Sequence, residues 1–482
     1  MEPLTWTGTA GTVMAPLTFA VAVVAVFAAL VLGGVSLFAR APVLRADASG
    51  RLMRPRGARP LAEAVNSLAW IALACLLGLW VVLGVVLPYG AAGIVGAIAK
   101  QLWPVWLALI ATFALSMQFR QRLGLYGKLF DSTVGMVGFA LVMFWVFTAL
   151  FAGAFDLIAT QDPLQAISGL KNKAPGIPLP SASEMAAGAH YLLGGDNLAR
   201  DVFSRVIDGS AIVIQIAPLA TLFAFMVGIT LGLPAGFYGG RLDTFLSFLA
   251  NLILAFPVIL LFYLLVTPEI TAIGLPSYLA AGLFLFPILF LAVLIWSRFH
   301  TQRLRALLIL IPVVGLGLLL YLSLINQTGT PIHFWPLDLF DVSPEILIVF
   351  VSVVFVNSPT VFRIVRGLTM DIKTRDYVAA AQTRGEGPWY IMLWEILPNA
   401  RGPLIVDFCL RIGYTTILLG TLGFFGLGLP PDSPDWGSTI NAGRQLLAIY
   451  PFPALVPAVA LLSLVLGLNL LADGLREESL KD

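Results

Sequence analysis

The stretch AIVIQIAPLATLFAFMVGITLGLPAGF, residues 211–237, determines the class of fold because it carries no charged residue. A helix needs about 20 apolar residues to cross the hydrocarbon core of a bilayer. Ten further apolar runs accompany it, and all are continuous, whereas the strands of a membrane barrel would alternate. The eleven runs lie at about 16–38, 67–89, 101–118, 131–155, 211–237, 244–267, 275–297, 306–326, 345–362, 404–428 and 452–475. The sequence therefore predicts an all-α integral membrane protein with about eleven transmembrane helices.

The composition agrees with this class and excludes several others. The 482 residues are 59% hydrophobic and only 11% charged, whereas soluble domains carry about 25% charged residues. A net charge of +2 excludes nucleic-acid binding driven by bulk charge. Two cysteines and three scattered histidines form neither a disulfide framework nor a metal cluster. No GxxxxGK[ST], GxSxG or HExxH motif occurs, so we expect no ATP hydrolysis and no other enzymatic activity in this chain.

The loop charges predict the orientation. Cytoplasmic loops of membrane proteins are enriched in Lys and Arg. With the C-terminus placed inside and eleven spans, 21 Lys and Arg residues fall inside, 6 fall outside and one lies within a span. This arrangement puts the N-terminus outside and the Arg-rich linker 39–66 inside. The first apolar run lacks a basic flank, so we expect a retained span rather than a signal peptide.

A long polar segment with helical patterning separates the ninth and tenth runs. Its core reads RDYVAAAQTRGEGPWYIMLWEILPNARGPL, residues 375–404. Gly385 tolerates a positive φ and would permit a turn between two short helices. Pro388 would start the second helix, and Pro398 would help to end it. An apolar stripe on that helix could face a protein partner or lie on lipid.

This segment resembles the EAA loop of permease subunits in ABC importers. The wider chain is similar to inner-membrane permeases of the dipeptide/oligopeptide/nickel family, which implies a type I importer core. Supporting stretches follow in the family's order over residues 120–482. They are LGGDNLARDVFSRVIDG (193–209), GFYGGRLD (236–243), AFP (255–257), FRIVRG (362–367), GFFGLGLPPDSPDWG (423–437) and NLLADGLRE (469–477).

The resemblance implies a division of the chain and a set of partners. The expected parts are an extension with about three spans (1–117), a first core span (118–155), an extracytoplasmic segment (156–210), core spans (211–267), a two-span insertion (268–344) and the remaining core (345–482) with the loop 363–403. Implied partners are a second homologous permease, two ABC ATPase domains, an extracytoplasmic substrate-binding protein and membrane lipid, with no nucleic acid. The chain would bind no cofactor, and ATP would be used by the partner subunits.

The resemblance also implies site residues, and the chain departs from the family pattern near several of them. Ala379 stands where the motif has Glu, Glu395 where the family often has His, Gly195 where it has Thr, and Ala199 where it has Gly. The coupling loop would use Ala379, Ala380, Ala381, Gly385, Leu397, Pro398 and Asn399. An extracytoplasmic gate or binding-protein contact would use Asp196, Arg200, Asp201, Arg205 and Trp436.

Physical reasoning about the second set leaves a structural alternative open. The stretch 196–205 has apolar residues at helical spacing, which predicts an interfacial helix with Asp196 as its cap. Asp201 and Arg205 would pair across one turn, either as a contact surface or as a packed ion-pair plug. Trp436 could sit at the headgroup level.

Two rival functions remain at this point. A stand-alone secondary transporter would need ionisable residues within its spans. Only Asp407 and Arg411 qualify, and they can pair with each other one turn apart. A membrane scaffold or sensor is the other rival. The expected function is permease activity in an ATP-driven importer for peptides or similar small solutes at the bacterial inner membrane.

Overall fold

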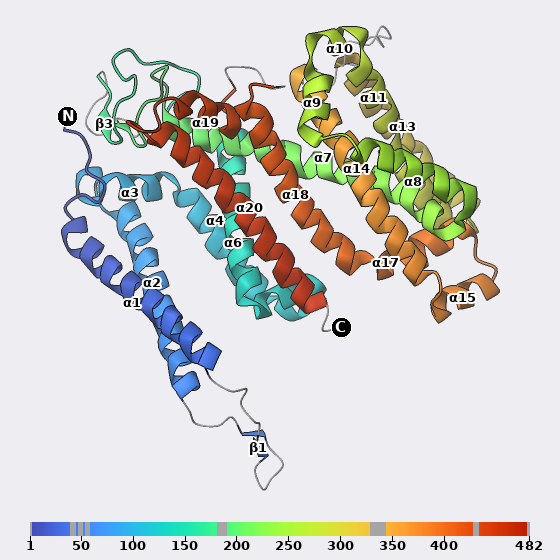
Figure 1. Ribbon diagram of the computed structural model, residues 1–482, viewed down its shortest axis with the longest axis horizontal. Coiled ribbons are helices and arrows are strands. Elements are labelled where there is room, and N and C mark those ends of the chain that lie inside the picture. Colours follow the sequence, from blue (N-terminus) through green and yellow to red (C-terminus); the bar gives the residue numbers. More distant parts are fainter. Residues whose placement is uncertain are drawn as a thin grey trace. The chain divides into compact units, whose positions relative to one another are not determined.

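The computed structural model describes residues 2–38, 45–46, 52–53, 58–180, 190–327, 344–427 and 433–479. Of the expected linker 39–66, residues 39–44, 47–51 and 54–57 therefore lie outside the described residues. The chain divides into two compact units (Figure 1), which are Met1–Trp106 with Ala166–Phe203, and Leu107–Gln165 with Ser204–Asp482. We call them the first and the second unit.

The first unit contains two long apolar helices and two short hairpins. Its elements are α1 (Gly11–Phe38), β1 (Arg45–Ala46), β2 (Leu52–Met53), α2 (Ala58–Val86), α3 (Tyr89–Gln101), β3 (Ile177–Pro178) and β4 (His190–Tyr191). Helices α1 and α2 pack through the small residues Ala25, Ala28 and Ala69. Trp80 Nε1 donates to Thr18 Oγ1 at 3.0 Å between the same helices. The antiparallel pair β3–β4 lies in the predicted extracytoplasmic segment.

Helix α4 (Trp103–Gln118) leads into the second unit, which holds the remaining elements. They are η1 (Arg120–Arg122), α5 (Gly124–Lys128), η2 (Leu129–Asp131), α6 (Thr133–Ala149), η3 (Leu150–Ala154), α7 (Val202–Tyr238), α8 (Gly240–Leu254), α9 (Val258–Val266), α10 (Pro268–Ile273), α11 (Leu275–Leu283), α12 (Leu285–Arg298), α13 (Arg303–Gln327), α14 (Pro344–Ile372), α15 (Asp376–Thr383), α16 (Pro388–Tyr390), η4 (Ile391–Ile396), α17 (Leu397–Asn399), α18 (Arg401–Phe424), α19 (Trp436–Arg444) and α20 (Phe452–Ser479). Helices α6, α18 and α20 run side by side (Figure 1).

The described helices confirm the all-α membrane class. Nine of them are long and apolar enough to cross a bilayer, and two bent pairs raise the number to eleven if each pair is one span. The bent pairs are α3–α4, with a 58° bend, and α8–α9, with an 82° bend. The pair α8–α9 coincides with the sixth run, 244–267, whereas only α4 of the other pair coincides with the third run, 101–118. Pro257 directly precedes α9, where a missing N–H and a fixed φ interrupt the helix.

Close helix contacts in the second unit use small residues. Gly228, Gly232 and Gly236 on α7 face α14 at four-residue spacing. A Cβ on Gly228 would lie 2.5 Å from a side-chain atom of Val361, so only glycine permits this approach. Without a hydrophobic force between helices in lipid, such close packing is a main source of helix association.

The ninth span is longer than its apolar run. Helix α14 ends at Ile372, ten residues beyond the expected end of the span. Its polar extension is stabilised from α8, because Arg366 Nη2 donates to Asp243 Oδ2 at 2.6 Å. The expected loop 363–403 therefore begins as a continuous helix, and the connection proper starts after Ile372. The tight turn in GFYGGRLD is confirmed, since Gly239 and Gly240 have φ of 68° and 62°.

Candidate functional site

The expected coupling loop forms two short helices joined by a glycine turn. Helix α15 ends in a pattern in which Glu386 N–H donates to Ala381 C=O at 3.2 Å and Gly385 N–H donates to Gln382 C=O at 3.0 Å. These are the two hydrogen bonds of a Schellman cap, which places its terminal residue in the left-handed region. Gly385 has a φ of 77°. The predicted turn at this glycine is confirmed.

The second helix starts at Pro388, as the sequence predicts. It ends at Asn399, one residue after Pro398, as expected. Residues 391–396 widen into a π-helical turn, and helical structure continues through Asn399. Proline has no N–H to donate to the carbonyl four residues earlier, which is consistent with the wider turn before Pro398 and with the helix end just after it.

The loop has one buried face and one exposed face. Val378, Ala381, Ile391, Met392 and Ile396 are buried, in one cluster with residues of α7, α14 and α18. The opposite face is exposed and includes the candidate residues Ala379, Ala380, Gly385, Pro398 and Asn399, whereas Leu397 is half-buried. Tyr377 and Trp389 are each 38% exposed on this loop. Large aromatic side chains left exposed beside small residues are typical of a contact surface.

Residues of the predicted insertion contact this loop. Trp394 Nε1 donates to Ser297 Oγ at 3.0 Å, at the end of α12. The Arg298 guanidinium lies 4.8 Å from the centre of the Trp394 ring. His300 approaches the Tyr390 ring with centroids 6.0 Å apart. The resemblance gave no sign of this contact, because the insertion lies outside it.

Glu395, which stands where the family often has His, also has a structural role. Arg384 Nη2 donates to Glu395 Oε1 at 2.8 Å, which links the end of α15 to the second helix. Arg384 is about half exposed, so solvent screening keeps this ion pair weak. It holds the two helices across the Gly385 turn rather than supplying much stability.

The predicted interfacial helix at residues 196–205 is wrong in its first half. Helix α7 begins only at Val202, and Asp196 caps no helix. Asp196 Oδ1 accepts hydrogen bonds from the backbone N–H of Leu198 and of Arg200, both at 2.8 Å. A short carboxylate that bonds backbone two residues ahead stabilises a turn in competition with a helix. Asp201 accepts from Phe203 N–H at 3.3 Å and occupies the cap position.

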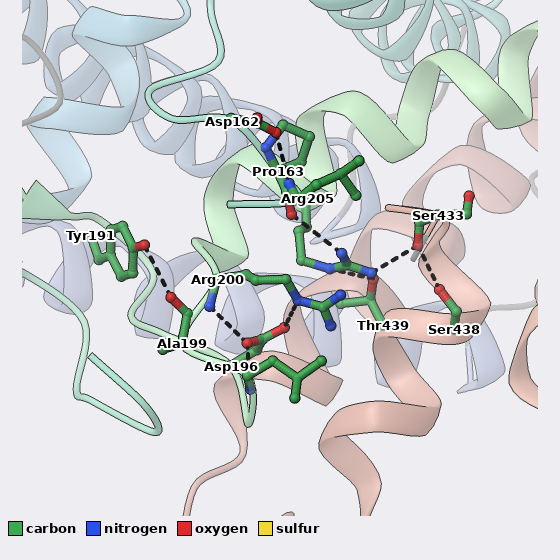
Figure 2. A network of polar contacts seen from close by, with 12 residues as sticks. Asp162, Pro163, Tyr191, Asp196, Ala199, Arg200, Arg205, Ser433, Ser438 and Thr439 are labelled. Atoms are coloured by element: carbon green, nitrogen blue, oxygen red, sulfur yellow. Dashed lines mark hydrogen bonds and ion pairs between the residues drawn. The ribbon is translucent and has the colours of Figure 1, made fainter. Parts of the chain in front are cut away.

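The ion pair found in this segment differs from the expected one. Asp196 Oδ2 accepts from Arg200 Nε at 2.7 Å, and both side chains are almost fully buried (Figure 2). The expected pair of Asp201 with Arg205 stays a prediction. The four-residue spacing of Asp196 and Arg200 could have revealed the observed pair.

A tyrosine fills the core beneath this turn. Tyr191 donates from its hydroxyl to Ala199 C=O at 3.2 Å (Figure 2). Burial, together with the negative charges of Asp201 and Asp196, raises the pKa of the Tyr191 hydroxyl. Two departures from the family pattern lie here. A Cβ on Gly195 would meet Leu170 O at 2.0 Å, and Ala199 has a φ of 64°. The first position has no room for a threonine side chain, and the second adopts a conformation that favours glycine.

In the second unit, Arg205 and Trp436 join α7 to α19. Arg205 donates to Ser433 C=O at 2.8 Å, to Pro163 C=O at 3.3 Å and to Thr439 Oγ1, with its guanidinium pointing into this group (Figure 2). Trp436 Nε1 donates to Val206 C=O at 2.8 Å. The exposed fractions are 0% for Arg205 and 1% for Trp436. The tryptophan is therefore buried in protein instead of lying at the headgroup level.

The five extracytoplasmic candidate residues are buried, so they do not form the outer surface of this region. Asp196, Arg200 and Asp201 are also at most 5% exposed, so all five candidates hold the local structure. Leu198, by contrast, is 55% exposed between Asp196 and Arg200. A helix over residues 196–205 would place Leu198 on its apolar side, so the helical prediction gave no sign of this exposed residue.

The charges within the tenth span pair with each other. Asp407 Oδ2 accepts from Arg411 Nε at 2.6 Å. This confirms the predicted pair and weakens the case for an ion-coupled transporter. Within the described residues, no group of three or more His, Cys, Asp or Glu side chains could hold a metal ion.

The chain is similar to known transport proteins. Residues 228–477, just over half of the 482 residues, match the family described as binding-protein-dependent transport system inner membrane component. The glutathione transport system permease protein GsiD of Pectobacterium atrosepticum is 28% identical over 295 residues, covering 61% of this chain and 73% of that protein. The dipeptide transport system permease protein DppC of Haemophilus influenzae is 28% identical over 336 residues, covering 70% and 87%. The DppC of Alkalihalophilus pseudofirmus is 26% identical over 324 residues, covering 67% and 81%.

These matches agree with the apolar helices and with the motif order of the sequence. The matched range contains the glycine turn after α7, the coupling loop and helices α18 to α20. The expectation of an inner-membrane permease is confirmed, because the chain belongs to the family of inner-membrane components of binding-protein-dependent transport systems.

Proposed function

We propose that this chain translocates peptides or similar small solutes, delivered by an extracytoplasmic binding protein and driven by separate ABC ATPase subunits. A second homologous permease completes the pathway, and two ATPase domains dock on the two permeases. The chain itself hydrolyses no ATP and binds no cofactor. Its relatives are named dipeptide and glutathione permeases, which supports the substrate class.

The observation that carries the proposal is the two-faced coupling loop. Its exposed face offers Ala379, Ala380 and Gly385, with Tyr377 and Trp389 beside them. Small side chains let a partner approach closely, and exposed aromatic rings gain most when they are buried by a partner. The exposed face is the ATPase docking surface.

The buried face explains how movement would reach the transmembrane helices. Val378, Ile391 and Met392 pack against α7 and α14 within one buried cluster. A close-packed core transmits displacement instead of absorbing it. A shift of the docked loop would therefore carry α14 and α18 with it, which would reorient the core between outward-facing and inward-facing states.

The orientation follows the loop charges. The coupling loop lies in the cytoplasm, and the segment 166–203 lies outside. Backbone contacts within the first unit support one part of this arrangement, because Leu4 N–H donates to Gly176 C=O at 2.9 Å. Residues near the N-terminus and the extracytoplasmic segment therefore share one side of the membrane.

The test introduces a carboxylate into the exposed face. Ala380→Asp leaves the isolated permease folded because the side chain is exposed. Docking would bury that carboxylate without a partner, at a cost of several kcal/mol. Gln121→Asp, exposed on the η1 turn, is the control. We expect Ala380→Asp to lose the co-purifying ATPase and ATP-driven dipeptide uptake in proteoliposomes, while Gln121→Asp keeps both. Normal assembly and uptake in Ala380→Asp would refute the docking surface.

A further inference from the structure

Residues 2–10 form an ordered contact within the first unit. In the sequence they lie more than 200 residues before the family-matched range, 228–477. Ile94 N–H donates to Thr5 C=O at 2.9 Å, Val95 N–H donates to Trp6 C=O at 3.1 Å, and Ala10 N–H donates to Ala91 C=O at 3.0 Å. The segment before α1 is thus hydrogen-bonded to the first half of α3, around the non-helical residue Gly93. We call residues 2–10 together with residues 88–95 the N-terminal clasp.

The clasp is built by glycines that permit very close backbone approach. Gly8 and Gly93 both have a positive φ, of 59° and 67°. A Cβ on Gly93 would lie 2.3 Å from Gly8 N, and a Cβ on Gly8 would lie 2.4 Å from Ala91 O. Each position therefore excludes a side chain for two independent reasons, which are the backbone conformation and the lack of space.

The clasp also holds the extracytoplasmic segment. Leu4 N–H donates to Gly176 C=O, and a Cβ on Gly176 would lie 2.4 Å from Leu4 O. His190 Nε2 lies 3.4 Å from Glu2 O. Gly176 directly precedes β3 and His190 is the first residue of β4, so the clasp contacts the antiparallel pair at both of its strands.

Further hydrogen bonds connect this hairpin to the exposed turn around Leu198. Gly176 N–H donates to Tyr191 C=O at 2.8 Å, and the Tyr191 hydroxyl bonds to Ala199. A connected set of contacts thus runs from residues 2–10 to the turn at residues 196–200. Ordering such a segment costs about 1–2 kcal/mol per residue in backbone entropy, and these contacts offset that cost.

We propose that the N-terminal extension positions the docking surface for the binding protein around Leu198, because its clasp holds residues 166–180 and 190–203 together in one conformation. This inference rests on the proposed function. It assigns a task to residues that lie before the family-matched range. Opening the clasp loosens the segment around Leu198 and weakens binding-protein contact, while the ATPase docking loop keeps its structure.

The experiment breaks the clasp from the N-terminal side and observes the distant segment. Gly93→Ala and Gly8→Ala each disrupt the close backbone contact between residues 8 and 93, from two different parts of the sequence. Gly90→Ala, in open space on α3, controls for an added methyl group. Gly124→Ala, with a φ of 55° and open space, controls for positive-φ strain outside the clasp. Trypsin cleavage at the exposed residues Lys171 and Lys173 reports opening of the segment.

Both clasp variants should be cleaved about tenfold faster than wild type, because cleavage follows the population of the open state. Both controls should match wild type. In the reconstituted complex, stimulation of ATP hydrolysis by the binding protein should fall in the clasp variants, while basal hydrolysis stays constant. Monodisperse elution of each purified variant checks that it is folded.

Two results would overturn the inference. One is wild-type cleavage in both Gly8→Ala and Gly93→Ala. The other is faster cleavage with unchanged binding-protein stimulation, since the clasp would then order the segment without serving docking. A wild-type complex that no binding protein stimulates would refute the proposed function instead, and the same cleavage ratios would still decide whether the clasp holds the segment.

Discussion

Replacing Gly385 by alanine tests whether the coupling loop acts through its left-handed turn. The residue has a φ of 77°, and a Cβ added there would meet no atom within 4 Å. The substitution therefore changes backbone strain without causing a clash inside the chain. The left-handed conformation costs a non-glycine residue about 1–2 kcal/mol of conformational free energy. An energy of this size changes a two-state population by a factor of about 5–30.

Gly387 is a matched control two residues away. Its backbone is extended, with φ of −67° and ψ of 152°, and a Cβ there also meets nothing. Alanine at this position adds the same methyl group to the same exposed loop without the conformational penalty. A difference between Gly385→Ala and Gly387→Ala therefore isolates the Schellman turn from any clash with the partner.

The assay measures ATPase affinity and transported substrate per ATP hydrolysed in proteoliposomes. We expect Gly385→Ala to bind the ATPase about 5–30-fold more weakly, because docking would have to restore the strained turn. Gly387→Ala should remain within about twofold of wild type. Equal affinities for the two variants would refute the reasoning, since the turn at Gly385 would then contribute nothing to docking.

Four further substitutions test the left-handed residue Ala199, the contact between Ser297 and Trp394, and the buried carboxyl group of Asp435. Ala199→Gly should raise the melting temperature in detergent, with a net gain of up to about 1 kcal/mol, because φ is 64° there; a lower melting temperature would contradict this. Ser297→Ala and Trp394→Phe should each cost about 1 kcal/mol, and the double variant should cost little more than either; additive losses would disprove a shared hydrogen bond. Burial outweighs hydrogen bonds from Ser438 and raises the pKa of Asp435, so the folded state favours its protonated form. Stability should therefore rise as pH falls through the raised pKa toward the ordinary value of 3.8, and melting curves of Asp435→Asn should lack this rise; parallel pH profiles would contradict it.

Short-range sequence patterns predicted the membrane class, one turn and helix start, and one ion pair. Uncharged runs identified the membrane class, because a polar backbone in lipid must satisfy its own hydrogen bonds within helices. Gly385 and Pro388 predicted a turn and a helix start from their own conformational limits. Asp407 and Arg411 predicted their pair from one-turn spacing.

Two predictions were wrong, the helix after Asp196 and the headgroup position of Trp436. In both cases hydrogen bonds in the folded protein outweigh the preference of the local sequence. The stretch after Asp196 has helical spacing, yet its carboxylate bonds to the backbone and forms a turn over a buried tyrosine. Trp436 looked like an interfacial residue, but Val206 supplies a carbonyl for its indole within the protein. Composition alone cannot distinguish burial in protein from burial in lipid, because both environments favour the same side chains.

The sequence by itself determined the apolar helices, the glycine turn in the loop before α18 and the family. Each of these depends on residues within a few turns of one another or on an ordered series of short motifs. Only the tertiary structure decided that the insertion holds Trp394 through Ser297 and that Gly93 meets Gly8 in the N-terminal clasp. Those contacts join residues dozens of positions apart, and their formation depends on the exact approach of two backbones, which no local pattern encodes.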